Sequence, residues 1–292
     1  MKVSERTETT TPTVFTEARF TALLTLLADE DPSVRATIRS TLLSAGNSIF
    51  SRLEHHRLHP DPEIRRRVVE LLDEQGRLKR DEEFMSFILT HGEQFDLEDA
   101  VWRFVLTTYP TVNVNAYRAQ LDEWSSIIRE QLPKESTAEA SLHGVNKVLF
   151  GDLHFRGNDA DYYQPANTYL NRVIDRRLGI PITLSLVYLF VAKRLGFPLV
   201  GIGMPGHFLC RYQSSWEELY VDAYHQGQLL TRIDCKRRIA NLAVEYDESF
   251  LAPLGSRRTL QRLISNLHLI HKEKEQLEEA QRLQRYLVAL SR

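Results

Sequence analysis

The feature that most constrains this sequence is an apolar helical segment followed at once by three short runs typical of β-strands. Within Ile182–Leu195, apolar side chains recur at helical spacing and form a stripe wide enough to predict a buried helix, which Gly196 and Pro198 end. The three runs that follow are Leu199–Met204, His207–Tyr212 and Glu218–Asp222. Turn-forming residues separate them, as in an antiparallel meander. The sequence therefore predicts a buried helix packed on a small antiparallel sheet.

Helical patterns dominate the first part of the chain. There, Asp31-Pro-Ser-Val-Arg35 recurs as Asp61-Pro-Glu-Ile-Arg65, and in both copies the aspartate can cap a helix whose first residue is proline. The repeat resembles those of HEAT-type helical proteins, and Gly46 and Gly76 stand at plausible helix ends. Further helices are expected at Glu82–Thr90, Leu97–Thr108 and Asn115–Gln131.

The C-terminal part of the chain has two more apolar stripes at helical spacing. One runs from Leu260 to Ile270 and the other from Leu277 to Leu290, with charged residues between them. This pattern predicts a helical hairpin that packs on another surface. Together with the small sheet, it makes the expected fold class α+β and mostly helical.

Composition argues against several classes of protein. The 37 basic and 39 acidic residues give a formal charge of -2, which provides no broad positive field for nucleic acid or an anionic membrane. No run approaches the ~18 apolar residues that cross a bilayer, and the first residues lack the apolar segment of a secretory signal. The two cysteines, Cys210 and Cys235, form no Cys-x-x-Cys pair, so neither a disulfide scaffold nor a cysteine-rich zinc site is expected. We therefore expect a cytoplasmic protein.

A histidine and an aspartate of the predicted sheet have the spacing of a base and its orienting acid. His207 is expected to begin one strand and Asp222 to end the next. A carboxylate beside an imidazole holds the ring in one tautomer and stabilises its charged form, as in a Cys-His-Asp triad. The N-terminus of the preceding helix would supply partial positive charge, which favours a thiolate nucleophile.

A long, ordered set of motifs resembles one known family. The motifs are Tyr162-Tyr163-x-Pro-x-Asn167, Tyr169-Leu-Asn171, Arg176-Arg-x-Gly-Ile-Pro-Ile-Thr-Leu-Ser185, Arg194-Leu-Gly196 and Pro205-Gly-His-Phe-Leu209. Between roughly Glu83 and Phe250 the sequence is similar to the transglutaminase-like core of bacterial SirB-type proteins, and the C-terminal hairpin resembles their TPR-like tail. The resemblance implies a papain-like fold, with a catalytic cysteine at the helix start, the base at His207 and the acid at Asp222.

The motifs and the helical patterns together predict four parts. Residues 1–14 would be a disordered tail, 15–82 a HEAT-like helical segment, 83–250 the transglutaminase-like domain and 251–292 a TPR-like hairpin. In this arrangement the papain-like helix and sheet are flanked by helical, repeat-like segments.

The catalytic cysteine of the family does not carry over to this chain. The helix-start position falls at Pro181, and the closest hydroxyls belong to Thr183 and Ser185. Strand alternation predicts that Cys210 points away from the imidazole and into the core. Cys235 lies beside basic residues that could lower its pKa, but nothing in the sequence places it at the helix start.

Three polar residues of the motifs, Asn167, Tyr169 and Asn171, are expected to line the same cleft, although asparagine also often caps or turns the chain. The loop after the acid departs from the family pattern. SirB-type proteins usually read Asp-Pro-Phe-x-Gly-Gly there, whereas this chain reads Asp222-Ala-Tyr-His-Gln-Gly227. The shape of that loop is therefore open.

The remaining charged groups are interpreted as structural. Arg176 and Arg177 are expected to buttress loops through carboxylates, and the basic run Lys236–Arg238 to lie on the surface. His55 and His59 have the i,i+4 spacing of metal ligands, but without a carboxylate-histidine motif a solvated helix face is favoured. No metal or cofactor is expected.

Without a thiol at the helix start, the favoured function is non-catalytic binding of a protein or peptide in the former catalytic cleft. The alternative is an active hydrolase or acyl transferase in which Thr183, Ser185 or a displaced cysteine attacks, with His207 as base and Asp222 as orienter. A third possibility is a scaffold whose cleft is filled by side chains.

Overall fold

The computed structural model describes residues 16–133, 135–214, 218–242 and 244–292, so the predicted tail at 1–14 lies outside the described residues. The described chain is mostly helical with a small antiparallel sheet, which confirms the predicted fold class. It divides into two compact units between Asp81 and Glu82. This boundary falls within one long helix, α4 (Pro62–Thr90).

The first unit contains α1 (Glu17–Leu27), α2 (Pro32–Ser44), α3 (Asn47–Glu54) and the first part of α4. The two Asp-Pro motifs begin helices as predicted. Asp31 accepts a hydrogen bond from the backbone N–H of Ser33 at 2.7 Å, and Asp61 accepts one from Glu63 at 2.8 Å. The arginine that ends each motif donates to a main-chain carbonyl ahead of its helix, Arg35 to Asp29 and Arg65 to His59.

The expectation that a helix ends near Gly76 was wrong, because α4 continues through this residue to Thr90. Glycine weakens a helix interior by only ~1 kcal/mol relative to alanine. Most residues that flank Gly76 between 70 and 83 are strong helix formers, so the penalty of one glycine does not interrupt the helix. The helix predicted at Glu82–Thr90 is accordingly the last part of α4.

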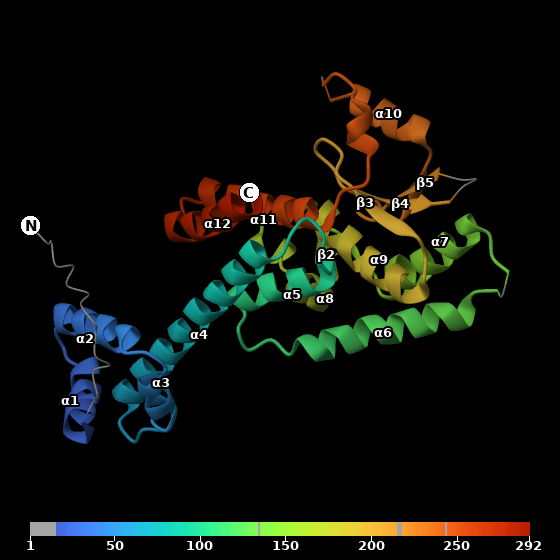
Figure 1. Ribbon diagram of the computed structural model, residues 1–292. Helices are drawn as coiled ribbons and strands as arrows, with labels where there is room; N and C mark the ends of the chain where they lie inside the picture. The colour runs from blue at the N-terminus through green and yellow to red at the C-terminus, as the bar shows by residue number, and fades with distance from the viewer. Residues whose placement is uncertain (1–15, 134, 215–217, 243) are drawn as a thin grey trace, which may run out of the picture. The chain divides into compact units, whose positions relative to one another are not determined.

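The second unit consists of helices around a small sheet (Figure 1). Its further α-helices are α5 (Leu97–Thr108), α6 (Val114–Gln131), α7 (Ala138–Asn146), α8 (Leu170–Arg176), α9 (Pro181–Leu195), α10 (Arg232–Ala240), α11 (Ser256–Glu273) and α12 (Leu277–Leu290). Short π- or 3-10-helical turns are η1 (Lys147–Asp152), η2 (Pro165–Asn167) and η3 (Glu248–Leu251).

The main sheet of this unit is fully antiparallel in the order β3-β4-β5-β6. Its strands are β3 (Leu199–Ile202), β4 (Leu209–Gln213), β5 (Glu218–Asp222) and β6 (Gln228–Leu230). The meander was predicted, but β6 was not, since three residues carry too little alternation to be recognised. A second, two-stranded parallel pair, β1 (Arg156–Gly157) and β2 (Leu178–Gly179), leads into α9.

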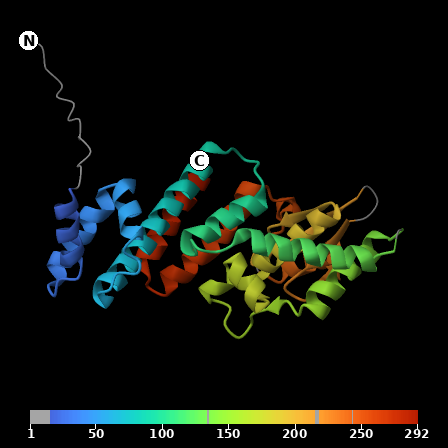
Figure 2. The same ribbon diagram turned by 90° about the horizontal axis from the view of Figure 1, so that it is seen from below.

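The predicted buried helix is α9, which lies between the sheet and α6 (Figures 1 and 2). Most of its residues are buried, including the polar Thr183 and Ser185. Cys210 of β4 is also fully buried, and its thiol lies 3.6 Å from the carbonyl oxygen of Ser185, so the predicted core position of this cysteine is confirmed.

The C-terminal helices α11 and α12 pack side by side as an antiparallel hairpin (Figure 2). Arg257 at the start of α11 donates hydrogen bonds to the carbonyl oxygens of Ala289 and Leu290 at the end of α12. The same guanidinium also binds the carbonyl oxygens of Ile88 and His91. One buried arginine therefore closes the hairpin and joins it to the end of α4.

Candidate functional site

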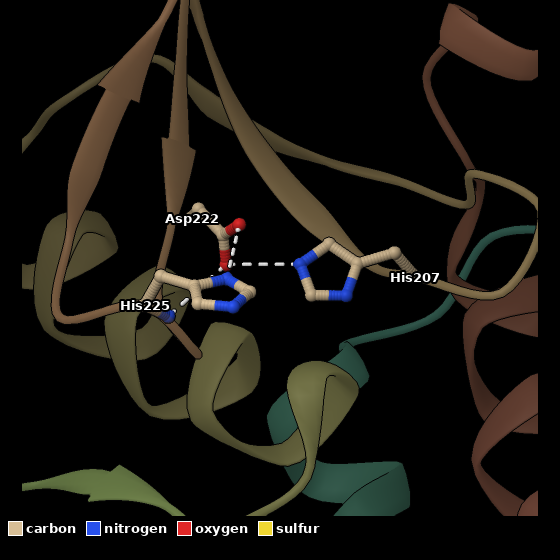
Figure 3. Close-up of side chains that lie close together, drawn as sticks. All are labelled: His207, Asp222 and His225. Carbon is tan, nitrogen blue, oxygen red and sulfur yellow. Dashed lines mark hydrogen bonds and ion pairs between the residues drawn. The ribbon is translucent and has the colours of Figure 1, made fainter. Parts of the chain in front are cut away.

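The predicted imidazole–carboxylate pair is formed in the structure (Figure 3). The Nε2 atom of His207 lies 2.9 Å from Oδ1 of Asp222, the last residue of β5. His207 was expected to begin a strand, but β4 begins two residues later at Leu209. The histidine instead ends a turn in which its backbone N–H donates to the carbonyl of Met204 and Gly206 has a φ of 68°.

Asp222 is fully buried and accepts hydrogen bonds from several donors. Besides His207, these are Nδ1 of His225 at 2.8 Å, the backbone N–H of His225 at 3.2 Å, and the guanidinium of Arg238. Burial of this carboxyl favours its neutral form, but the hydrogen bond and electrostatic attraction of His207 and the hydrogen bonds from Arg238 and His225 outweigh that effect and hold its pKa well below the ordinary value. Asp222 is therefore an anion at neutral pH.

The two candidate hydroxyl nucleophiles are bonded to the main chain. Oγ1 of Thr183 lies 2.8 Å from the carbonyl oxygen of Asn167 and accepts from the N–H of Ile180 at 3.0 Å. Oγ of Ser185 donates to the carbonyl of Phe208 at 3.4 Å. Pro181, where the resemblance puts the nucleophile, is the first residue of α9. Among the residues that the structure describes, Asp222 alone forms a hydrogen bond with the ring of His207.

Neither cysteine has the accessible, low-pKa thiol of a nucleophile. Both Cys210 and Cys235 are buried, and burial raises the pKa of each thiol to about 12. The thiolate is the reactive form of cysteine, and its fraction at neutral pH is negligible when the pKa is so high. Cys210 lies on β4 and Cys235 on α10, so neither occupies the start of α9.

The three residues expected to line the cleft are buried instead. Asn167 is fully buried, and its side chain donates to the carbonyls of Asp161 and Tyr162 at 2.7 and 3.0 Å. The ring of Tyr169 stacks within the core, and Asn171 is 3% exposed. The sequence shows that Asn167 is polar but not that its side-chain amide already donates to main-chain carbonyls.

The two adjacent arginines contact an amide and aromatic rings rather than carboxylates. Arg176 donates to Oδ1 of Asn167 at 3.1 Å. The guanidinium of Arg177 lies over the rings of Trp124 and Phe155, 4.5 and 4.7 Å from their centroids. The expectation that both arginines bind carboxylates was therefore wrong, because Arg176 binds an amide oxygen and Arg177 lies over aromatic rings.

The loop after Asp222 is held in place by a neighbouring helix. The side-chain amide of Asn146, at the end of α7, donates to the carbonyl of Gly227 at 2.7 Å. Gly227 has a φ of 77°, and a Cβ atom there would lie within 2.2 Å of the Asn146 side chain, so both backbone and space require glycine. The turn places the backbone N–H and the imidazole of His225 within hydrogen-bond distance of the Asp222 carboxylate.

Sequence reasoning missed two members of this site, His225 and Arg238. Arg238 was assigned to the surface with its basic neighbours, yet α10 directs its guanidinium to the buried carboxylate and to Gln228 at 2.8 Å. A signal for His225 was present, since it stands three residues after Asp222 in the loop where the sequence departs from the pattern that the resemblance leads one to expect. By contrast, the rings of His55 and His59 form hydrogen bonds with local main-chain atoms, of Ser51 and Asp61.

A row of aromatic rings extends from His207 toward solvent. The ring of Tyr224 lies 6.1 Å from that of His207 and 6.2 Å from that of Tyr162, which contacts Tyr163 at 5.2 Å. We call Tyr162, Tyr163 and Tyr224 the tyrosine row. Tyr163 is 57% exposed, and the hydroxyl of Tyr224 donates to Asp159 at 2.6 Å. The row places a partly exposed apolar surface beside the imidazole.

A separate cavity of about 420 Å³ borders the C-terminal half of α9. Apolar side chains including Leu97, Phe190 and Leu199 line it, together with the polar Lys193 and Thr259. None of the site residues predicted from the sequence is among its lining residues.

The comparisons with known proteins agree with this architecture. The family model described as the transglutaminase-like superfamily matches residues 115–265, which include α9, the sheet and the His207–Asp222 pair. The chain belongs to the transglutaminase-like superfamily. No solved structure matches it. Within the described ranges, no helix combines the length and apolarity that crossing a membrane would require.

Among curated proteins, the chain is similar to UPF0162 proteins of bacteria. It is 33% identical to one from Xylella fastidiosa (strain 9a5c) over 180 residues, 60% of this chain and 64% of that protein. It is 31% identical to one from Pseudomonas aeruginosa over 155 residues, 52% of this chain and 56% of the relative. The chain thus spans less than two thirds of these relatives. Mouse F-box only protein 21 is 36% identical over 134 residues, 43% of this chain and 21% of the mouse protein.

Proposed function

We propose that this transglutaminase-like protein binds a protein or peptide and does not catalyse acyl transfer. The observation that supports the proposal is that the candidate nucleophiles are bonded to the main chain or buried. The ring of His207 is paired with Asp222, but the described hydroxyls of Thr183 and Ser185 bind main-chain atoms and both thiols are buried. Loss of the nucleophile in a triad lowers turnover by up to about a million-fold, whereas it removes no binding surface.

The tyrosine row is the surface that we assign to recognition. Tyrosine is enriched at binding interfaces because it combines a large rigid apolar ring with a hydroxyl that can hydrogen-bond. Here Tyr163 is exposed, while Tyr224 is anchored by Asp159, so the row offers an ordered platform. The matching region of mouse F-box only protein 21 makes up about a fifth of that protein, which is consistent with a domain that works as a module.

Selection from a random peptide library on the full chain tests the binding function. Peptides that bind the wild-type protein should bind Tyr163→Ala at least about fivefold more weakly, because truncating an interface anchor costs more than ~1 kcal/mol. Leu277→Ala is the matched control, since Leu277 is 65% exposed and lies on α12. Equal affinity for both variants, or no selectable peptide, would overturn the proposed surface.

The catalytic alternative is tested on the same protein. A fluorescent primary amine and a glutamine-containing protein substrate report acyl transfer, and mass spectrometry reports an acyl adduct on the chain. We expect neither product above background for wild-type protein or for His207→Ala. Turnover by the wild type that His207→Ala abolishes would refute the non-catalytic function and favour attack by Thr183, Ser185 or a displaced cysteine.

A further inference from the structure

We infer that His207, Asp222 and His225 form a binding site for a transition-metal ion of the Zn²⁺ class. The inference goes beyond peptide recognition, which requires no metal. One ring nitrogen of His207, a carboxylate oxygen of Asp222 and one ring nitrogen of His225 all lie within 4.8 Å of one another, and Figure 3 shows the three side chains together. They come from the β3–β4 turn, the end of β5 and the β5–β6 turn.

The donor set is the one that zinc accepts. Two imidazole nitrogens and one carboxylate oxygen, bound at ~2.0–2.2 Å, make a three-ligand site in which a fourth position remains for water or another ligand. In the described geometry both imidazoles direct a ring nitrogen at the same carboxylate, at 2.9 and 2.8 Å. A single cation between the three groups would replace the two imidazole N–H protons that now occupy these hydrogen bonds.

Only a small movement is needed to close the ligands around an ion. The side chain of His225 is 55% exposed and can rotate, while His207 is 16% exposed and Asp222 is buried. The backbone of the turn that carries His225 is fixed by Asn146 through Gly227. The site therefore combines two positioned ligands with one adjustable ligand.

Arg238 is compatible with a bound cation although it shares Oδ2 of Asp222 with the ring of His225, because each carboxylate oxygen can accept two donors. A carboxylate has two oxygens and about four lone-pair sites. The guanidinium binds Oδ2 of Asp222, and the backbone N–H of His225 binds Oδ1 at 3.2 Å. These two donors remain when the imidazoles turn to the ion, and they orient the carboxylate as outer partners do in metal sites.

Zinc titration of the full chain, in competition with a chelating dye, tests the inference without any peptide. We expect wild-type protein to bind one Zn²⁺, and His225→Gln to bind it at least about tenfold more weakly, since loss of an outer partner alone costs 10–100-fold. His143→Gln is the matched control, because His143 is 62% exposed on α7 and outside the cluster. His59→Gln controls for the pair with His55.

Cobalt provides a second readout with the same variants. Co²⁺ bound by wild-type protein should give the intense visible bands of a four-coordinate ion, and His225→Gln should lose them. Because His225 is exposed, the variant is expected to fold, and circular dichroism checks this. Absence of one-to-one binding by the wild type, or binding by His225→Gln equal to that of His143→Gln, would overturn the metal site. Either result leaves the peptide experiments unaffected.

Discussion

Asn167 provides the sharpest test of the buried polar network beside α9. All four side-chain hydrogen bonds of this residue are satisfied within the protein: it accepts from Asn158 and Arg176 at 3.0 and 3.1 Å and donates to the carbonyls of Asp161 and Tyr162. A buried hydrogen bond contributes ~0.5–1.5 kcal/mol, and its loss leaves each partner unsatisfied. Replacing Asn167 with alanine should therefore lower the free energy of unfolding by about 4 kcal/mol.

Urea unfolding followed by tryptophan fluorescence measures this loss. Asn115→Ala is a suitable control, because Asn115 is exposed on α6 and its substitution should change stability by no more than ~0.5 kcal/mol. A loss below ~1 kcal/mol for Asn167→Ala would refute the assigned network. If that variant kept its stability but lost peptide binding, Asn167 would belong to the cleft after all.

Two further predictions concern the thiols and the buried carboxylate. Burial raises the pKa of the Cys210 and Cys235 thiols to about 12, so a thiol-reactive dye should label neither cysteine in the native protein at neutral pH and both cysteines in urea. Rapid labelling of either cysteine in the native protein would contradict its assignment to the core. The folded-state pKa of Asp222 is depressed, so the charge of this carboxylate contributes stability above the ordinary carboxyl pKa near 4, and that contribution is lost as the pH falls below it. The cost of Asp222→Asn, ~3 kcal/mol at pH 5, should therefore shrink at pH 3. A cost that does not change with pH would disprove the depressed pKa.

The helix and sheet could be predicted because their signals are local. The apolar stripe of α9 and the Asp-Pro helix starts depend on neighbouring residues, and the structure has them where they were expected. Whether β4 begins at His207 or Leu209, and whether α4 continues through Gly76, depends instead on the balance between the conformational preference of one residue and the interactions of its neighbours. Such boundaries are decided by packing and hydrogen bonds that no short window contains.

The residues of the candidate site likewise divide into those that local sequence signals reveal and those that only the tertiary structure reveals. His207 and Asp222 could be found because family motifs mark them and because they stand at the ends of β-compatible runs. The positions of His225 and Arg238 depend on a turn fixed by Asn146 from a distant helix and on the direction of α10. Their contacts join residues that no periodicity relates, so only the tertiary structure shows that three side chains share one carboxylate.

The contacts of Asp222 also decide how its pairing with His207 should be interpreted. The carboxylate joins the β3–β4 turn, the β5–β6 turn and α10 through three different side chains. Removing one partner of a buried ion pair destabilises a protein whether or not the pair takes part in a reaction, so the pair alone is no argument for catalysis. Catalysis would require a nucleophile near the other ring nitrogen, and the described thiols and the hydroxyls of Thr183 and Ser185 are bonded elsewhere or buried. Substitution of His225 is therefore more informative than substitution of Asp222, because it changes the metal ligands while leaving the bonds from His207 and Arg238 to the carboxylate in place.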